Sequence, residues 1–196
     1  MKWRTAVLAA CGVAGAAFTI NPATAANVKI TPLGSHDGEF CPMDRAMVFE
    51  DPDGTRVLYD AGRTVAGADD KRLGKIDAVL LSHVHGDHLG DRRLPQVNAG
   101  TCDKPDASVE TTPNSNMVDI ALAKNAKLLL GGEMPAFFSN KIKAIGGDPS
   151  LVQTVRFGAS RKIGGVAVTS VPAVHSNGLS GAFIGGQFGE HLHGVG

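Results

Sequence analysis

Residues 83–88 read His-Val-His-Gly-Asp-His, and this run constrains the chain more than any other feature. The apolar run at 76–82 comes directly before it and is typical of a buried strand. A strand that ends in clustered nitrogen and oxygen donors is a rigid support for a metal site. Imidazole suits zinc and similar ions, and carboxylate suits harder cations. The run therefore predicts metal binding at a strand end.

The spacing within the run suits two adjacent ions better than one. His83 and His85 are two positions apart, so extended backbone would point both imidazoles the same way. We expect Gly86 to turn the chain through a positive φ, which glycine adopts cheaply. Asp87 and His88 would then face a second metal position nearby. A solvated histidine-rich loop is the alternative, and it fits less well with a mid-chain position directly after a strand.

His-x-His-x-Asp-His after an apolar strand resembles the signature of the metallo-β-lactamase superfamily. The segment 57–62, Val-Leu-Tyr-Asp-Ala-Gly, resembles that family's strand ending in Asp-x-Gly. The segment 171–176, Val-Pro-Ala-Val-His-Ser, resembles its strand end with a third histidine and is similar to the family's metal-dependent hydrolase group. The resemblance covers most of the chain after its N-terminal leader. It implies an α/β fold, a partial αββα sandwich whose mixed sheet has helices on its outer face.

The resemblance also assigns roles to single residues. It implies that His83, His85 and His175 hold a first metal ion. Asp87 and His88 would supply part of a second metal site. Asp87 would also be catalytic, because it could orient the metal-bound water and take its proton. Asp60 would brace the ligand loop without touching metal. The cofactor implied is Zn²⁺, one or two ions, with Mn²⁺ or iron as alternatives.

These roles imply an enzyme, an exported hydrolase that uses a metal-bound hydroxide on an ester, lactone or related bond of a small molecule. A serine nucleophile is not expected, because the sequence has no Gly-x-Ser-x-Gly motif. Two alternatives stay open: a phosphodiesterase of the same superfamily, and a metal-binding module without turnover. The sequence indicates no oligomeric state.

The family pattern continues with a bridging Asp after a further hairpin and a final His near the C-terminus, and neither of these pieces is present in this sequence. The only acidic residue after His175 is Glu190. We therefore expect residues 26–196 to form a metallo-β-lactamase-like domain whose C-terminal half is incomplete. The first metal site would be complete and the second would not, so the hydrolytic activity of these residues alone would be very low.

The N-terminus has the pattern of a signal peptide, residues 1–25. Lys2 and Arg4 precede an uncharged, Gly/Ala-rich stretch, and Ala23-Thr24-Ala25 fits a cleavage site. This pattern predicts a periplasmic or secreted protein with no stable membrane span after processing. A retained membrane anchor, or a lipoprotein modified at Cys11, is the lesser alternative.

Charge argues against a nucleic-acid partner. Loss of the leader removes two basic residues and no acidic ones, so the formal net charge moves from +0 to −2. The remainder has no cluster of Lys and Arg, which a nucleic-acid surface would need.

Two cysteines remain after the leader, Cys41 and Cys102. A pair of cysteines in an exported protein suggests a disulfide, and two unrelated thiols are the alternative. Both residues fall in loops expected at the active-site face, so a bridge would fix its rim.

Hydrophobic patterning predicts strands that alternate with two helices. Strands are expected at 27–33, 45–50, 55–60, 76–82, 127–131, 151–157 and 166–171, and helices at 116–124 and 135–145. Segments 62–74 and 91–115 are expected to be irregular, the latter a long surface loop. The remaining histidines, His36, His191 and His193, are more typical of solvated loops than of metal ligands.

Overall fold

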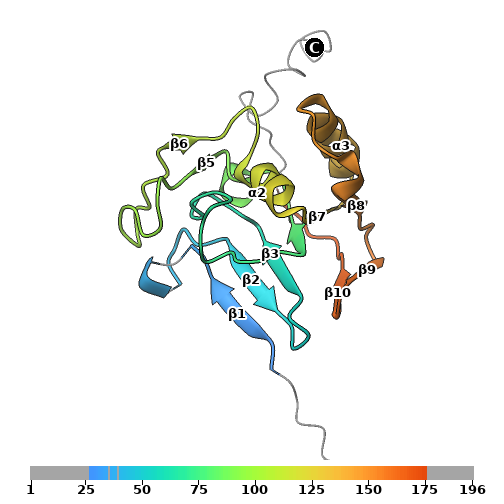
Figure 1. The fold of residues 1–196 in the computed structure, drawn as a ribbon, viewed down its shortest axis with the longest axis horizontal. Helices are drawn as coiled ribbons and strands as arrows, with labels where there is room; N and C mark the ends of the chain where they lie inside the picture. The colour runs from blue at the N-terminus through green and yellow to red at the C-terminus, as the bar shows by residue number, and fades with distance from the viewer. Residues whose placement is uncertain (1–26, 35, 39, 176–196) are drawn as a thin grey trace, which may run out of the picture.

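The computed structural model describes residues 27–34, 36–38 and 40–175 (Figure 1). The predicted signal peptide and the predictions made for Glu190, His191 and His193 lie outside these residues. Among the helices described, none has the length and apolarity that a bilayer crossing requires.

A mixed six-stranded sheet organises the fold, as predicted. Its strands lie in the order β1-β2-β3-β4-β7-β8. They are β1 (Lys29–Pro32), β2 (Met47–Glu50), β3 (Arg56–Tyr59), β4 (Ala78–Leu80), β7 (Lys127–Leu130) and β8 (Val152–Thr154). The first two pairings are antiparallel and the other three are parallel. The parallel half therefore brings several strand ends to one edge.

The strands β2 and β3 form a hairpin. Its turn is closed by Asp51, whose side chain accepts a hydrogen bond from the Thr55 backbone N–H at 2.7 Å. Gly54 adopts φ +80° there, which glycine tolerates without strain.

Two longer helices follow the ligand loop, α2 (Asn116–Lys124) and α3 (Met134–Ala144). The bounds of α2 agree with the prediction, and Ser115 caps it by accepting the Val118 backbone N–H. The chain leaves α3 through Gly146 at φ +78°. The helix α3 lies one residue earlier than the predicted 135–145, and its N-cap, Glu133, makes no side-chain capping hydrogen bond.

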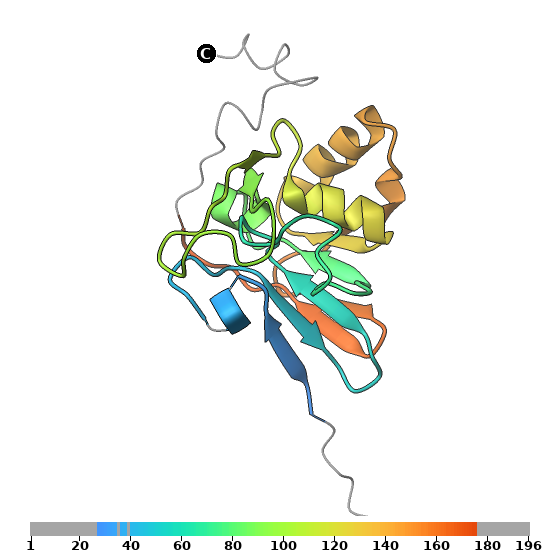
Figure 2. The same cartoon turned by 60° about the vertical axis from the view of Figure 1, so that its left-hand side comes forward.

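The two faces of the sheet carry alternate residues of each strand. Successive positions enter different clusters: Leu58, Val79 and Leu128 join the larger core, and Val57, Ala78 and Leu129 join a smaller one. The larger core includes the apolar stripes of α2 and α3. The smaller core is closed by a hairpin of β9 (Ser160–Ile163) and β10 (Val166–Thr169). Figure 2 shows the helices and this hairpin on opposite sides of the sheet.

The strand β9 was missed by the sequence analysis, and the predicted strand at 151–157 ends early, at Thr154. In β9, Ser160, Arg161 and Lys162 are exposed and polar, so no alternation of apolar and polar residues marks this strand. A turn at Gly164-Gly165 joins the two strands, with Gly164 at φ +52°.

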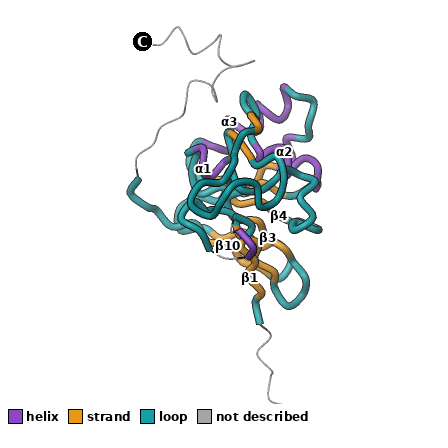
Figure 3. Tube along the Cα trace, turned by 90° about the vertical axis from the view of Figure 1, so that its left-hand side faces the viewer, coloured by secondary structure: helices purple, strands orange, loops and turns teal. Residues whose placement is uncertain are grey.

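The segment 91–115 is mostly loop, as predicted (Figure 3). It also contains a small antiparallel pair that the sequence analysis did not anticipate, β5 (Arg92–Arg93) and β6 (Val109–Glu110). Two-residue strands are too short to leave a periodic signal.

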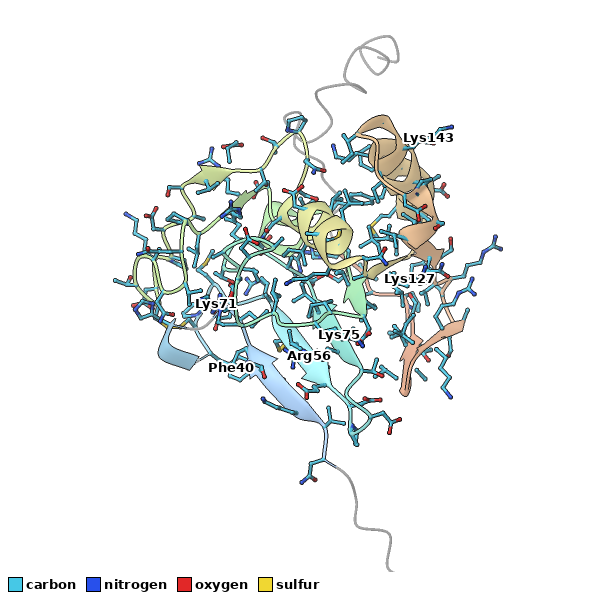
Figure 4. All side chains as sticks on the ribbon, in the orientation of Figure 1. Phe40, Arg56, Lys71, Lys75, Lys127 and Lys143 are labelled. Carbon is cyan, nitrogen blue, oxygen red and sulfur yellow. A yellow bond between two sulfur atoms is a disulfide. The ribbon has the colours of Figure 1, made fainter. Side chains whose placement is uncertain are left out.

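The irregular segment 62–74 is tied to the sheet through Arg56. The Arg56 guanidinium donates to the backbone oxygens of Leu73 at 3.0 Å and Lys75 at 2.9 Å. Figure 4 shows Arg56 and Lys75 side by side at this end of β3. A segment without regular structure is thus held in place by side-chain contacts.

Candidate metal centre

The site lies where the parallel strands β3 and β4 end side by side. Asp60 directly follows β3, and its backbone N–H donates to the Leu80 oxygen at 2.9 Å. The ligand loop follows β4 and runs into the short helix α1 (Gly86–Leu89). Parallel pairing therefore brings Asp60 and the ligand loop to one edge of the sheet.

Three histidines meet at this edge, as the resemblance implied. Donor nitrogens of His83, His85 and His175 all lie within 4.8 Å of one another. The ring centroid of His83 lies 4.6 Å from that of His85 and 4.5 Å from that of His175. His175 comes from the segment after β10, so folding joins residues that are far apart in the sequence.

Hydrogen bonds to Ser82 orient His83. The Ser82 hydroxyl donates to Asp60 Oδ2 at 2.7 Å, which leaves its oxygen free to accept from His83 Nδ1, 3.0 Å away. We assign the proton of His83 to Nδ1 on this basis. Its Nε2 then carries a lone pair and is buried without a hydrogen-bond partner among the described residues. A buried nitrogen of this kind suits a metal ligand.

The environment of His83 favours its neutral form. Burial, followed by the nearby His88, His85 and His175, lowers the pKa of His83 to about 4. Neutral imidazole is the form that binds a metal ion.

His88 is held by the buried Asp60. Its Nδ1 lies 2.6 Å from Asp60 Oδ2, and the Asp60 side chain has no solvent exposure. Asp60 Oδ1 also accepts the backbone N–H of Ser82 at 2.8 Å. Asp60 thus links to the ligand loop through both Ser82 and His88, and Ser82 was not identified from the sequence. The sequence signal available for Ser82 was its position directly before the ligand loop.

Asp87 lies close to His88 and to an arginine that the sequence analysis missed. Its Oδ2 is 3.6 Å from His88 Nε2 and accepts a hydrogen bond from Arg45 Nε at 3.1 Å. Burial alone would raise the pKa of Asp87. His88 and Arg45 outweigh that effect and hold this pKa below its usual value. Arg45 is distant in sequence, and no motif marked it.

The prediction that Gly86 turns the chain through a positive φ is wrong. Gly86 begins α1, and the positive φ of +76° occurs at Gly90, which ends this helix. Glycine at position 86 instead leaves room for a neighbouring ion pair. An added Cβ would overlap the Asp91 carboxylate and the Arg63 guanidinium, which are paired at 2.6 and 2.8 Å.

Cys41 and Cys102 form a disulfide, with their Cα atoms 5.3 Å apart. The bond joins the loop before β2 to the long loop after α1. It holds the segment that leads to Arg45, because Cys41 and Asp44 are also linked by hydrogen bonds in both directions.

His36 does not join the histidine cluster. It lines a separate small cavity together with Arg72, Asn98 and Thr101. His36 therefore differs from the solvated loop histidine that was expected, because it begins a short 3-10 helix, His36–Gly38, and is half-buried.

These residues fit a metal ion. Three imidazoles converge, one of them has a buried nitrogen without a partner, and a carboxylate fixes the neighbouring His88. Such a donor set suits Zn²⁺ or a similar borderline ion. Asp87 and His88 are next to it and could hold a second ion.

Comparisons with known proteins agree with this geometry. Residues 45–92 match the family model described as the metallo-beta-lactamase superfamily. The chain is also 27% identical over 132 residues to a UPF0173 metal-dependent hydrolase of Koribacter versatilis (strain Ellin345), covering 66% of this chain and 43% of that protein. The chain thus spans less than half of that relative's length. The resemblance of this chain to the metallo-β-lactamase superfamily is confirmed, and the family match contains Asp60, Arg45 and the whole ligand loop.

Proposed function

We propose that this protein is an exported hydrolase whose metal ion is held by His83, His85 and His175. The observation that carries the proposal is the convergence of three imidazoles, one of which, His83, has a buried Nε2 without a hydrogen-bond partner among the described residues. The similarity to a metal-dependent hydrolase supports the same reaction class. Zn²⁺ is the proposed ion because the donor set is three imidazoles.

When bound, the ion would act as a Lewis acid and would lower the pKa of water at the site. The chain's own residues prepare the site for this chemistry. Ser82 places the proton of His83 on Nδ1, so that its Nε2 keeps a lone pair, and Asp60 holds the Nδ1 side of the His88 ring. Asp87 has a lowered pKa and is ionised at neutral pH, so it can accept a hydrogen bond from the attacking water and orient it.

Charges around the centre favour an ester or lactone over a phosphodiester. Arg45 is paired with Asp87, and Arg63 is paired with Asp91. Neither guanidinium is an uncompensated cation that would attract a phosphate. A small substrate with a neutral carbonyl group therefore matches these surroundings better.

Two features support export. The N-terminal pattern of residues 1–25 is that of a cleavable leader. The Cys41–Cys102 disulfide is typical of proteins from oxidising compartments. Mass spectrometry of protein expressed with its full leader tests this step. A mature chain beginning at Ala26 is expected, whereas a lipid-modified Cys11 or an uncleaved N-terminus would contradict it.

The metal centre is tested by elemental analysis of the purified full chain. We expect about one tightly held zinc ion per chain, because only the tri-histidine set is complete among the described residues. His83→Ala should lower the metal content well below this level. His36→Ala is the matched control and should keep it, because His36 lies in a separate cavity. An unchanged metal content in His83→Ala would remove His83 from the ligand set.

Hydrolysis is tested with a panel of lactones, carboxylic esters and phosphodiesters. The expected result is chelator-sensitive turnover of a lactone or ester that His83→Ala lacks. Turnover limited to phosphodiesters would favour the phosphodiesterase alternative. Zinc binding without turnover of any substrate would favour a metal-binding module.

A further inference from the structure

Arg45 is held in a fixed position beside the metal centre. Its Nε donates to Asp87 Oδ2 at 3.1 Å, and its Nη1 donates to the backbone oxygens of Asp44 at 2.8 Å and Pro42 at 3.2 Å. The guanidinium therefore bridges its own loop and the ligand loop. About a third of each side chain of the pair is exposed, with 34% for Arg45 and 29% for Asp87.

The loop that carries Arg45 is itself anchored. Asp44 Oδ2 accepts the backbone N–H of Cys41 at 2.6 Å, and Cys41 is bonded to Cys102. Arg45 thus extends from a segment closed by a hydrogen bond and a disulfide. A guanidinium held this way loses less conformational entropy on pairing than a free surface arginine does.

Arg45 contacts the oxygen that a second ion would use. Asp87 Oδ2 lies 3.6 Å from His88 Nε2, so a cation between these two atoms would be adjacent to the Arg45 guanidinium. Two positive groups would then share one carboxylate oxygen, and they would repel each other. Either the guanidinium must leave Asp87 or the second ion must bind weakly.

We propose that Arg45 competes with a second divalent ion for Asp87, so that a second ion binds more weakly than the incomplete ligand set alone would allow. This inference rests on the proposed function, since it takes the ion at the tri-histidine site as given. Arg45 then lowers the affinity for a second ion, and it keeps Asp87 oriented in the singly loaded protein.

The test is calorimetric titration of the metal-free full chain with Zn²⁺. Arg45→Met removes the charge and keeps much of the aliphatic stem. We expect the second equivalent to bind about tenfold more tightly in this variant, with the first unchanged, because a competing cation has been removed. Arg92→Met is the control, since Arg92 pairs with the exposed Glu110 and its loss changes net charge equally. The double variant Arg45→Met/Asp87→Asn should lose the gain.

A second measurement uses the wild-type protein and does not depend on the variant folding. The NMR signal of the Arg45 Nε–H, assigned by its absence from Arg45→Lys, should stay in place during the first equivalent of Zn²⁺. It should move only with the second, when the guanidinium leaves Asp87.

The outcomes separate this inference from the proposed function. A normal first equivalent, combined with an unchanged or weaker second one in Arg45→Met, would overturn the role of Arg45 alone. An Nε–H signal that moves with the first ion would also overturn it. Wild-type protein that binds no ion at the tri-histidine site would overturn the proposed function and this inference together.

Discussion

Asp60 Oδ2 lies 2.6 Å from His88 Nδ1, and the same carboxylate accepts both the backbone N–H and the hydroxyl of Ser82. The side chain of Asp60 is fully buried. Its backbone adopts φ +44°, a conformation that few residues other than glycine, Asn and Asp tolerate. A single carboxylate thus orients the ligand loop that follows β4.

Replacing Asp60 should weaken folding and metal binding together. Asp60→Ala leaves three donors without their acceptor, so we expect a loss of about 2–4 kcal/mol in the free energy of unfolding. Metal affinity should fall by about 10- to 100-fold. Urea unfolding and zinc titration measure the two effects. Asp60→Asn keeps the shape and the backbone preference and should lose less, whereas equal losses in both variants would contradict the hydrogen-bonding role.

The stability of the metal-free protein should fall as the pH decreases from about 6.5 to about 4. The pKa of His83 is lowered to about 4 in the folded protein, so in this range the unfolded chain binds more protons. Above about pH 6.5, His83 is neutral in both the folded and the unfolded chain, so its titration no longer changes the stability. After solvent screening we expect a loss on the order of 1 kcal/mol. Urea unfolding of wild type and His83→Gln checks this, because an identical pH dependence in both would contradict it.

Gly86→Ala should destabilise the protein by about 1 kcal/mol, the cost of disturbing the partly exposed Arg63–Asp91 pair, whose side-chain ends can move away from the added methyl group. Gly131→Ala is the matched control. Its added Cβ would lie 3.5 Å from the Val155 oxygen, an ordinary contact, and we expect a change within about 0.5 kcal/mol. Thermal or urea unfolding compares the two variants, and similar stabilities would contradict the packing argument at Gly86.

Loss of the disulfide should destabilise the folded state by about 4 kcal/mol, because Cys41 and Cys102 are separated by 61 positions and the bond restricts the unfolded chain. Cys41→Ser/Cys102→Ser, compared with wild type under oxidising conditions, measures this difference. Reductant should lower the stability of wild type and leave the double variant unchanged. A double variant as stable as oxidised wild type would show that the bond contributes little.

Local signals in the sequence explain which parts of the fold could be predicted. The β2–β3 hairpin follows from the turn at 51–54, and α2 follows from the apolar stripe of Met117, Ile120 and Ala121. The strand β9 could not be found in the same way, because its exposed Arg161 and Lys162 hide its one apolar contact, Ile163. Its pairing with β10 depends on tertiary structure.

In the candidate site, too, residues within a local motif could be predicted, whereas residues brought together only by folding could not. The ligand loop was visible as a local motif, and His175 was reached through the family resemblance. Arg45 could not be found, since its role depends on contact with Asp87 across 42 positions of sequence. The role of Gly86 was misjudged for a related reason: the Arg63–Asp91 pair that fills the space beside it is formed only by folding.

The meeting of His85 and His175, with ring centroids 4.9 Å apart, has a consequence for folding as well as for chemistry. An ion bound by both residues would cross-link the two ends of the segment 85–175, which contains α2, β7, α3 and β8. Its binding energy would then add to the stability of the native state. The melting temperature of the protein would therefore rise with the free Zn²⁺ concentration, and a chelator would lower it.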